Sequence, residues 1–267
     1  MLFSTLLHHS TPPTGGSVDP DAQTYFDTLD TAGYPLDASE QGWINNRVLN
    51  LKGTAAGSIT SDATNVWDDL LLLVFYQYNA GAGDTAYAVI GGNAVDGGTP
   101  TWDANGFTPS DLINHDLAAA LDVAVGVNAG FAINVAAEFG SFQNFSPLFQ
   151  IQGFAARFRA QGGFKVHYGK AIGFTYPTGS VDFQFIAYDL QGESSGIPCT
   201  AKIDDGVTVQ GWTDSAVIFK LPETSDLRTL TQIADKQQYA MKAIAVIDHR
   251  LTQAESDSIQ AILNATT

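Results

Sequence analysis

Near its N-terminus the chain carries apolar residues at the three- and four-residue spacing of amphipathic helices. The first helix is predicted to begin at Asp19-Pro20, because Asp is a good N-cap and Pro suits the first helical turn. Gly33 is expected to end it. Its apolar face consists of Ala22, Tyr25, Phe26 and Leu29.

Two further helices are predicted in the same region. Asp37 and Glu40 have the spacing of a capping box, and the helix that follows them ends at Gly53. Its apolar positions are Ile44, Val48 and Leu51. A third helix is predicted from about residue 62, on the spacing of Ala63, Val66, Trp67, Leu70, Leu71 and Val74. The three helices would form a small unit spanning residues 19 to 78.

Beyond the turn-rich segment 79–84, short β-prone runs separated by Gly, Pro and Asn replace the helical spacing. The clearest runs are 131–139, 148–151, 154–158, 164–168, 181–188 and 216–219. In the first run, alternation would place Phe131, Ile133 and Val135 on one side of a sheet and Ala132, Asn134 and Ala136 on the other. Many short strands with regular turns predict an antiparallel β-sandwich rather than parallel βαβ units.

One hairpin is predicted from local chemistry. Asp204-Asp205-Gly206 separates the β-prone runs 200–203 and 207–209, and Asp-Gly between such runs favours a tight hairpin turn. The two runs should therefore pair as antiparallel neighbours.

The end of the chain combines a buried strand with a helix. The run 239–248 is apolar at both alternating sets of positions, which predicts a strand buried on both faces in the middle of a sheet. Thr252 and Glu255 have capping-box spacing and predict a final helix packed near that strand. The buried face of this helix is Ile259, Ile262 and Leu263.

Composition narrows the range of partners. The formal net charge is −16, from 28 acidic and 12 basic residues, which argues against nucleic acid and against an anionic membrane surface. Only 15% of residues are charged and 26 are Gly, which suits short strands joined by tight turns. The single cysteine, Cys199, permits neither an intramolecular disulfide nor a cysteine-based zinc site.

The first 18 residues are predicted to form a flexible arm, because residues 10–18 are rich in Pro, Thr, Gly and Ser. The apolar start lacks the basic flank of a signal peptide. The longest apolar run, residues 70–76, is far too short to span a bilayer, so no membrane partner is expected.

The sequence lacks the residue patterns of common enzymes. A glycosidase needs two carboxyl groups roughly 5–10 Å apart. Glu40 and Glu255 are explained as helix caps and Glu138 as a solvated residue on a strand face. The five histidines show no metal-ligand spacing, and there is no glycine-rich phosphate loop. We therefore predict that the chain is not an enzyme and has no catalytic residues.

The segments 148–169, 183–188, 201–212 and 239–263, in that order, resemble laminin G-like domains of the concanavalin superfamily. In that family a strand pair bears an Asp-Gly turn, and the last strand leads into a helix of the form Leu-Thr-x-Ala-Glu, here residues 251–255. The resemblance covers about residues 84–267. It implies a mainly β fold, a jelly-roll sandwich of antiparallel strands, preceded here by the small α-helical unit.

The N-terminal part resembles the opening of uncharacterised phage structural proteins, in the segments 19–33, 44–52 and 97–107 and in a predicted helix with Trp-Asp-Asp at 67–69. This implies a virion location, on the tail or the capsid exterior, with other virion proteins as partners. Because such components are commonly symmetric, we expect a homo-oligomer, and specifically a trimer. The expected division is an arm at 1–18, a helical unit at 19–83, and a sandwich with a C-terminal helix at 84–267.

The resemblance also implies two kinds of ligand. Laminin G-like domains often hold calcium at the sandwich rim, so calcium is the one cofactor left open. Asp204 and Asp205 are its candidate ligands, with Asp182 and Asp189 flanking another strand, although turn chemistry also explains the Asp-Asp-Gly sequence. Aromatic rings near strand ends could stack on a sugar or pack in the core. These candidates are Trp102, Trp212, Tyr168 and Tyr176.

Three functions follow from these observations. The first is a virion structural component that presents the sandwich outward. The second is a carbohydrate-binding module that attaches the particle to a host surface glycan. The third is a glycan hydrolase, which is motivated only by fold relatives and would require two carboxylates facing each other across a groove.

Overall fold

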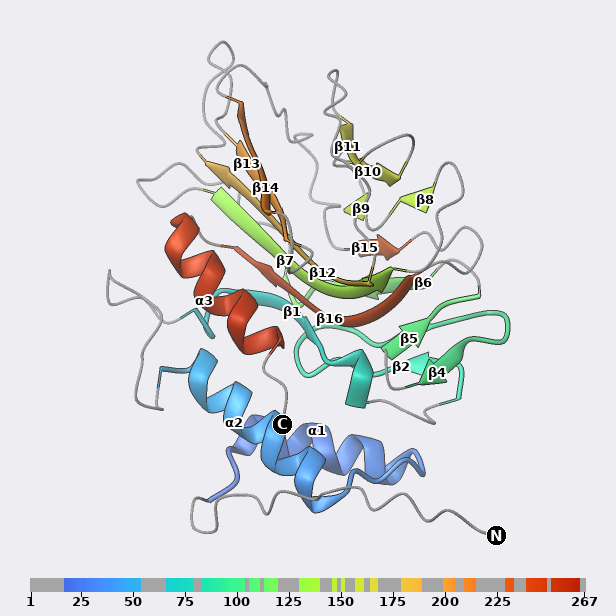
Figure 1. Ribbon diagram of the computed structural model, residues 1–267. Coiled ribbons are helices and arrows are strands. Elements are labelled where there is room, and N and C mark those ends of the chain that lie inside the picture. The colour runs from blue at the N-terminus through green and yellow to red at the C-terminus, as the bar shows by residue number, and fades with distance from the viewer. Residues whose placement is uncertain are drawn as a thin grey trace, which may run out of the picture.

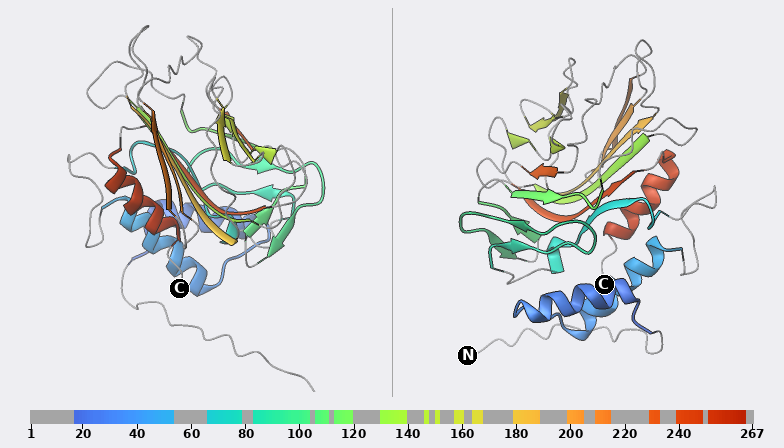
Figure 2. Two further views of the ribbon diagram at one scale, coloured as in Figure 1. Left: turned by 45° about the horizontal axis from the view of Figure 1, so that its top comes forward. Right: turned by 180° about the vertical axis from the view of Figure 1, so that it is seen from behind.

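A computed structural model gives the arrangement of the chain. It describes residues 17–53, 66–78, 83–103, 106–110, 113–119, 130–139, 146–147, 150–151, 157–160, 164–167, 179–188, 199–204, 209–214, 229–232, 239–248 and 251–264. A large curved antiparallel sheet forms the centre of the molecule, with the helices against one face and the short strands of smaller sheets beyond the other (Figures 1 and 2). The predicted class, an antiparallel β-sandwich preceded by a small helical unit, is confirmed.

The first two helices match the prediction. α1 (Pro20–Thr31) is capped by the Asp19 side chain, which accepts from the Asp21 backbone N–H at 2.9 Å. α2 (Ala38–Leu51) begins with a capping box, in which Glu40 accepts from the Asp37 backbone N–H at 2.8 Å. The predicted apolar positions of both helices are buried.

The large sheet has the strand order β14-β13-β12-β7-β16-β5-β4, and β1 also pairs with β16. Every neighbouring pair is antiparallel. The strands are β1 (Leu70–Val74), β4 (Thr101–Asp103), β5 (Gly106–Thr108), β7 (Gly130–Phe139), β12 (Gly179–Tyr188), β13 (Cys199–Asp204), β14 (Val209–Asp214) and β16 (Tyr239–Ile247). β16 lies in the middle of the sheet, and residues 243–247 have no exposed surface, as predicted for a strand buried on both faces.

The predicted third helix is wrong. Residues 70–74 form strand β1, which pairs with residues 244–247 of β16, and a 3₁₀ turn, η1 (Tyr76–Tyr78), follows it. Leu70 and Leu73 belong to the core on the helical side of the sheet. All five residues of β1 are buried, because β1 has neighbouring layers on both faces.

Short strands make the layer opposite the helices (Figure 2). One small sheet has the order β11-β10-β8, a second β6-β15-β9, and a third pairs β2 with β3. Their bounds are β2 (Thr85–Ala86), β3 (Ala94–Val95), β6 (Ile113–Asp116), β8 (Ser146–Pro147), β9 (Gln150–Ile151), β10 (Arg157–Ala160), β11 (Phe164–His167) and β15 (Thr229–Gln232). The predicted run 216–219 lies outside the described residues.

The two faces of the large sheet bury different residues. Along β7, Ala132 and Ala136 join the core formed with the helices. Phe131, Ile133 and Val135 alternate with them and are equally buried, on the face toward the small sheets. The predicted alternation along this strand is therefore confirmed.

The last helix, α3 (Gln253–Asn264), lies across the helical face of the sheet (Figure 1). Glu255 accepts from the Thr252 backbone N–H at 2.7 Å, and Thr252 Oγ1 accepts from the Glu255 N–H at 3.2 Å, which completes the predicted capping box. Arg47 of α2 is 3% exposed and donates from Nε to the Ile262 carbonyl at 2.9 Å. This bond joins α2 to α3.

The predicted hairpin is present as β13 and β14, paired from Cys199–Asp214 to Asp204–Val209. The connecting residues 205–208 lie outside the described part of the chain. Across the described ranges, no helix combines the length and the apolar character needed to cross a bilayer.

Candidate functional site

The sheet face beneath α3 is polar along three adjacent strands. The strand register aligns Asn134, Gln184 and Lys202 in one row across β7, β12 and β13. The next row is Ala136, Asp182 and Asp204. A third row pairs Glu138 with Ser180. Because these are alternate positions along each strand, the side chains share one face, which we call the polar face. The polar face consists of Asn134, Glu138, Ser180, Asp182, Gln184, Lys202 and Asp204.

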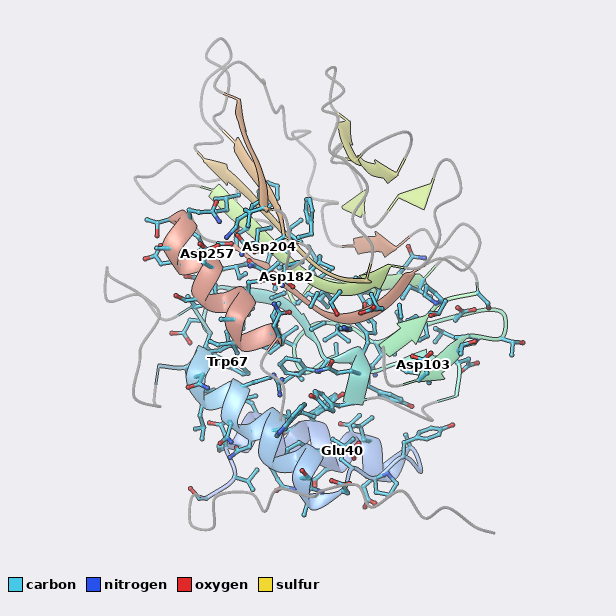
Figure 3. The ribbon with its side chains drawn as sticks, in the orientation of Figure 1. Glu40, Trp67, Asp103, Asp182, Asp204 and Asp257 are labelled. Carbon is cyan, nitrogen blue, oxygen red and sulfur yellow. The ribbon has the colours of Figure 1, made fainter. Side chains whose placement is uncertain are left out.

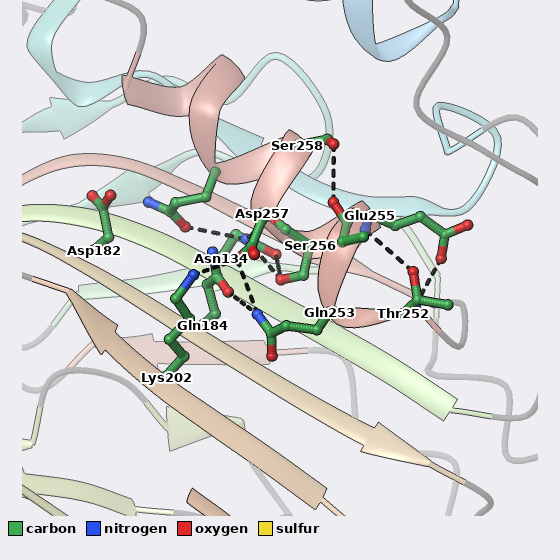
Figure 4. A network of polar contacts seen from close by, with 12 residues as sticks. Asn134, Asp182, Gln184, Lys202, Thr252, Gln253, Glu255, Ser256, Asp257 and Ser258 are labelled. Atoms are coloured by element: carbon green, nitrogen blue, oxygen red, sulfur yellow. Dashed lines mark hydrogen bonds and ion pairs between the residues drawn. The ribbon is translucent and has the colours of Figure 1, made fainter. Parts of the chain in front are cut away.

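Asn134 fixes α3 to the polar face. Its side chain has no exposed surface, and its Nδ2 donates to the Ser256 carbonyl at 2.9 Å and to Gln260 Oε1 at 3.1 Å. Gln260 Nε2 donates to the Val135 carbonyl at 3.1 Å. Buried amides need such partners, because an unsatisfied one would cost a free energy of about 1–3 kcal/mol. The close-up in Figure 4 shows this network between helix and sheet.

A second set of contacts joins α3 to the strands β12 and β13. Lys202 Nζ lies 2.7 Å from Asp257 Oδ1 on α3. Gln253 Nε2 donates to Gln184 Oε1 and, at 3.0 Å, to Asp257 Oδ1. Burial disfavours the charge of Asp257, yet the hydrogen bonds from Lys202 and Gln253 outweigh it and hold the Asp257 pKa below its usual value.

Asp182 and Asp204 lie directly opposite each other on β12 and β13 (Figure 3). Residues paired in this way have Cβ atoms about 5 Å apart. Asp182 accepts a hydrogen bond from Asn264, near the end of α3. Burial is the main cause that raises the Asp182 pKa to about 6, and the Asp204 carboxylate adds to the effect, against the hydrogen bonds from Asn264 and Gln260.

Glu138 is tied into an ion pair at the edge of the polar face. Its Oε2 lies 2.8 Å from Lys242 Nζ and accepts from Ser180 Oγ at 2.6 Å. Burial opposes the Glu138 charge, but the bonds from Lys242 and Ser180 outweigh it and lower the Glu138 pKa. Glu138 therefore stays charged and bound to Lys242 and Ser180, whereas we expected a solvated residue without such partners.

Chemically, the polar face offers one carboxyl group that can gain or lose a proton near pH 6, beside a second carboxylate. The two groups lie side by side on neighbouring strands under a helix. A glycan hydrolase would need two carboxylates that face each other across a groove. Asp182 and Asp204 are not arranged in this way, because they lie side by side on paired strands.

Among the predicted sugar platforms, Trp102 is the one whose side chain is described. It lies on β4, is partly exposed, and its Nε1 donates to the Gly83 carbonyl at 2.8 Å. Its ring centroid is 4.4 Å from that of Phe107, which has no exposed surface. Trp102 is thus anchored on the core while part of it faces solvent. The backbone of Trp212 is in β14, but its side chain, like Tyr168 and Tyr176, lies outside the described parts.

The predicted calcium ligands are only partly described. Asp204 ends β13 and lies beside Asp182, whereas Asp205 and Asp189 fall outside the described residues. Calcium takes six to eight oxygen ligands. Within the ranges that the structure describes, no three His, Cys, Asp or Glu side chains are grouped to hold a metal ion. The described residues therefore do not by themselves fit a calcium site.

A buried histidine was missed by the sequence reasoning. His115 on β6 has no exposed surface; its Nδ1 lies 2.8 Å from the Gly92 carbonyl and its Nε2 lies 3.0 Å from Tyr76 Oη. A carbonyl can only accept, so Nδ1 carries the proton and Nε2 accepts from the tyrosine. Burial lowers the His115 pKa to about 4. The alternation of Ile113 and His115 as inward residues of β6 was the available signal.

No model of a known protein family matches the sequence, and no curated protein matches it. Solved structures do share the fold. Trypanosoma rangeli sialidase matches with a TM-score of 0.50 and 10% identity, over 84% of this chain and 38% of the sialidase chain. The chain thus spans little more than a third of that enzyme. Lectin II from Ulex europaeus, at a TM-score of 0.39 and 12% identity, covers 63% of this chain and 91% of the lectin. Domain 4 of AbnA, an extracellular arabinanase from Geobacillus stearothermophilus, has a TM-score of 0.37 and 10% identity, over 73% of this chain and 98% of that domain.

The strand arrangement defines an antiparallel β-sandwich, and the sialidase matched at a TM-score of 0.50 shares this fold. This match contradicts our prediction that the chain is not an enzyme. At 10% identity the likeness is one of fold.

Proposed function

We propose that this chain is a carbohydrate-binding module built on a lectin-like β-sandwich. The observation that carries the proposal is the fold shared with Trypanosoma rangeli sialidase over 84% of this chain. That sialidase has also been solved in complex with sialic acid, with the same TM-score of 0.50. Sialylated glycans are therefore the first ligand class to test.

The exposure and the fixed orientation of the Trp102 ring also support the proposal. An aromatic ring that binds a sugar must keep one part open to solvent and hold its orientation without the ligand, since ordering a side chain on binding costs free energy. Trp102 is partly exposed on β4, while Phe107 and the Gly83 carbonyl hold its ring. We assign it the role of a stacking platform.

A glycan array with the purified chain tests this function. We expect retention on a defined set of glycans and at least tenfold weaker binding by Trp102→Ala, with Trp212→Ala as the comparison for the second candidate platform. Val95→Ala is the control, because Val95 is 58% exposed on β3 and should bind as the wild type does. No retention on any glycan would end the proposal, and progressive loss of the glycan itself would assign hydrolysis instead. Parallel arrays with calcium and with a chelator test the proposed role of Asp204 and Asp205.

A second candidate is a structural component of a phage particle, on the tail or the capsid exterior. The resemblance of residues 19–33, 44–52 and 97–107 to phage structural proteins favours it. Imaging and mass spectrometry of purified particles would test it, and absence of the chain from the particles would refute it. The associated trimer predicts a sedimentation mass of three chains of 28.4 kDa, and a monomer at high concentration would contradict this.

A further inference from the structure

We propose that the aromatic side chains of Tyr34 and Trp102, together with Asp84, form one binding site for a neutral sugar ring, and that this site disfavours glycans that end in sialic acid. The proposal rests on the carbohydrate-binding function, to which it adds a ligand class and two binding residues. The fold comparison makes sialylated glycans the first class to test, whereas the residues around Trp102 favour neutral ones.

Two aromatic side chains from distant parts of the chain contact Gly83. Trp102 on β4 donates from Nε1 to the Gly83 carbonyl at 2.8 Å. Tyr34 lies between α1 and α2, and its hydroxyl would be 2.7 Å from a Cβ atom added at Gly83. Only glycine fits here, because φ is +66° and a side chain would collide with the tyrosine. Gly83 thus brings a residue of the helical part and a residue of the sandwich together, and Figures 1 and 2 show β4 on the same side of the molecule as the end of α1.

The two side chains offer different groups to a ligand, and both are partly exposed. The Trp102 N–H is bonded to Gly83, so this residue offers the apolar surface of its ring. The Tyr34 hydroxyl has no hydrogen-bond partner within the described part of the chain, so it can donate to a sugar hydroxyl and accept from one. A sugar ring has C–H groups on its faces and hydroxyl groups at its edge, which matches an aromatic surface beside a few polar groups.

Asp84 gives the site its charge preference. It follows Gly83, is exposed, and its Oδ1 accepts from Thr85 Oγ1 at 3.0 Å. A carboxylate has about four lone-pair sites, so Asp84 can also accept a hydrogen bond from a sugar hydroxyl. The same negative charge would repel the carboxylate of sialic acid.

The basic residues do not offset this charge. A bound carboxylate is best stabilised by a positively charged partner. Each basic side chain that the structure describes is bonded to a residue outside the site: Arg47 to the Ile262 carbonyl, Lys52 to Asp19, Lys202 to Asp257 and Lys242 to Glu138. Within the described residues, the site therefore has acidic and neutral groups, which suit a neutral sugar.

Matched pairs of glycans test the ligand class. Each pair consists of a neutral glycan, such as lactose, and the same glycan with a terminal sialic acid, such as 3′-sialyllactose. We expect the wild type to bind the neutral member at least threefold more tightly, since a like charge about 6 Å away in water changes affinity about threefold. The preference should shrink in about 0.5 M NaCl, because salt screens this repulsion.

Variants test the two added residues. Tyr34→Phe removes only the hydroxyl and should weaken binding of the neutral glycan at least threefold. Asp84→Asn should reduce the preference for the neutral member, whereas Asp27→Asn removes the same charge from the exposed side of α1 and should keep it. Gly83→Ala should weaken binding at least fivefold, because its Cβ displaces the Tyr34 hydroxyl. Gly179→Ala is its control, since φ is +83° there and the nearest contact is an ordinary 3.8 Å.

The outcomes separate this site from the proposed function. A wild type that binds no glycan would end both. Binding that Trp102→Ala abolishes, but that Tyr34→Phe leaves unchanged, would keep the function and refute the site. Tighter binding of the sialylated member would keep the function and refute the neutral ligand class. Because Tyr34→Phe keeps the ring and its packing, the site stays testable even if Gly83→Ala fails to fold.

Discussion

His115 gives the sandwich a stability contribution that depends on pH. Its imidazole bridges two parts of the fold, because β6 belongs to a small sheet whereas Tyr76 follows β1 of the large sheet. Neutral imidazole fits this site, with Nδ1 donating to the Gly92 carbonyl and Nε2 accepting from Tyr76. Protonation would place a charge among buried groups, and we expect His115→Asn to remove that titration.

The size of the effect follows from the pKa. Burial lowers the His115 pKa from 6.5 to about 4, so the folded state resists protonation that the unfolded chain accepts. The stability is fully present above pH 6.5 and is lost as the pH falls toward 4. Since each pKa unit corresponds to about 1.4 kcal/mol, the free energy of unfolding should fall by about 3 kcal/mol across this range.

Urea unfolding of the wild type and of His115→Asn at several pH values between 8 and 4.5 would measure this contribution. The difference between the two proteins isolates His115, because all other titrating groups are common to both. We expect the wild type to be more stable at pH 8 by about 1–3 kcal/mol, from the lost bond to Tyr76, and this advantage to shrink with acid. His9→Asn, in the segment predicted to be a flexible arm, should leave the dependence unchanged. A difference that stays constant within about 0.5 kcal/mol over the whole range would refute the reasoning.

Two further predictions concern stability at neutral pH, both measured by denaturant unfolding. Asn134→Asp should lower the free energy of unfolding by about 3 kcal/mol or more, because it replaces a buried hydrogen-bond donor by an acceptor. The control, Asn114→Asp on the exposed side of β6, should change the free energy of unfolding by less than about 0.5 kcal/mol. Equal effects of the two substitutions would contradict the role of the Asn134 network. Gly106→Ala should lower the free energy of unfolding by about 2–4 kcal/mol, because φ at Gly106 is +114° and an added Cβ would lie 2.0 Å from a backbone oxygen of β16. Gly33→Ala, where φ is +88° and the added Cβ would meet open space, should lower it by about 1 kcal/mol. A Gly106→Ala variant as stable as Gly33→Ala would show that β5 can move away from β16.

The helices with caps were predictable because their signals are local. Asp19, Asp37 and Thr252 each cap a helix whose start the sequence marks. Such a cap depends on residues within about one turn, so no knowledge of the tertiary fold is needed. The apolar faces of these helices followed from the same spacing.

The strand at 70–74 was predicted as a helix because its pattern fits both structures. Leu70, Leu71 and Val74 recur at helical spacing, but the uninterrupted apolar run is also typical of a strand covered on both faces. Its true partner is β16, far along the chain. A pairing over such a distance leaves no local trace, so the sequence alone could not decide.

The polar face could not be predicted from the sequence either. Asp182 and Asp204 were both noted as acidic residues near strand ends, yet their juxtaposition depends on the register between β12 and β13. A shift of one residue would place one of them on the opposite face. Asn134 was placed correctly on the side opposite Phe131, but its partners on α3 arise only from tertiary packing.

The position of β16 determines the order in which the chain can assemble. β16 pairs with β7, β5 and β1, and Leu73 meets Ala245 in the finished sheet. During synthesis, the edges of β1, β5 and β7 that pair with β16 therefore keep unpaired backbone N–H and C=O groups until β16 has left the ribosome. Such edges invite pairing with other chains, so interrupted translation before residue 239 should give insoluble fragments rather than smaller folded ones.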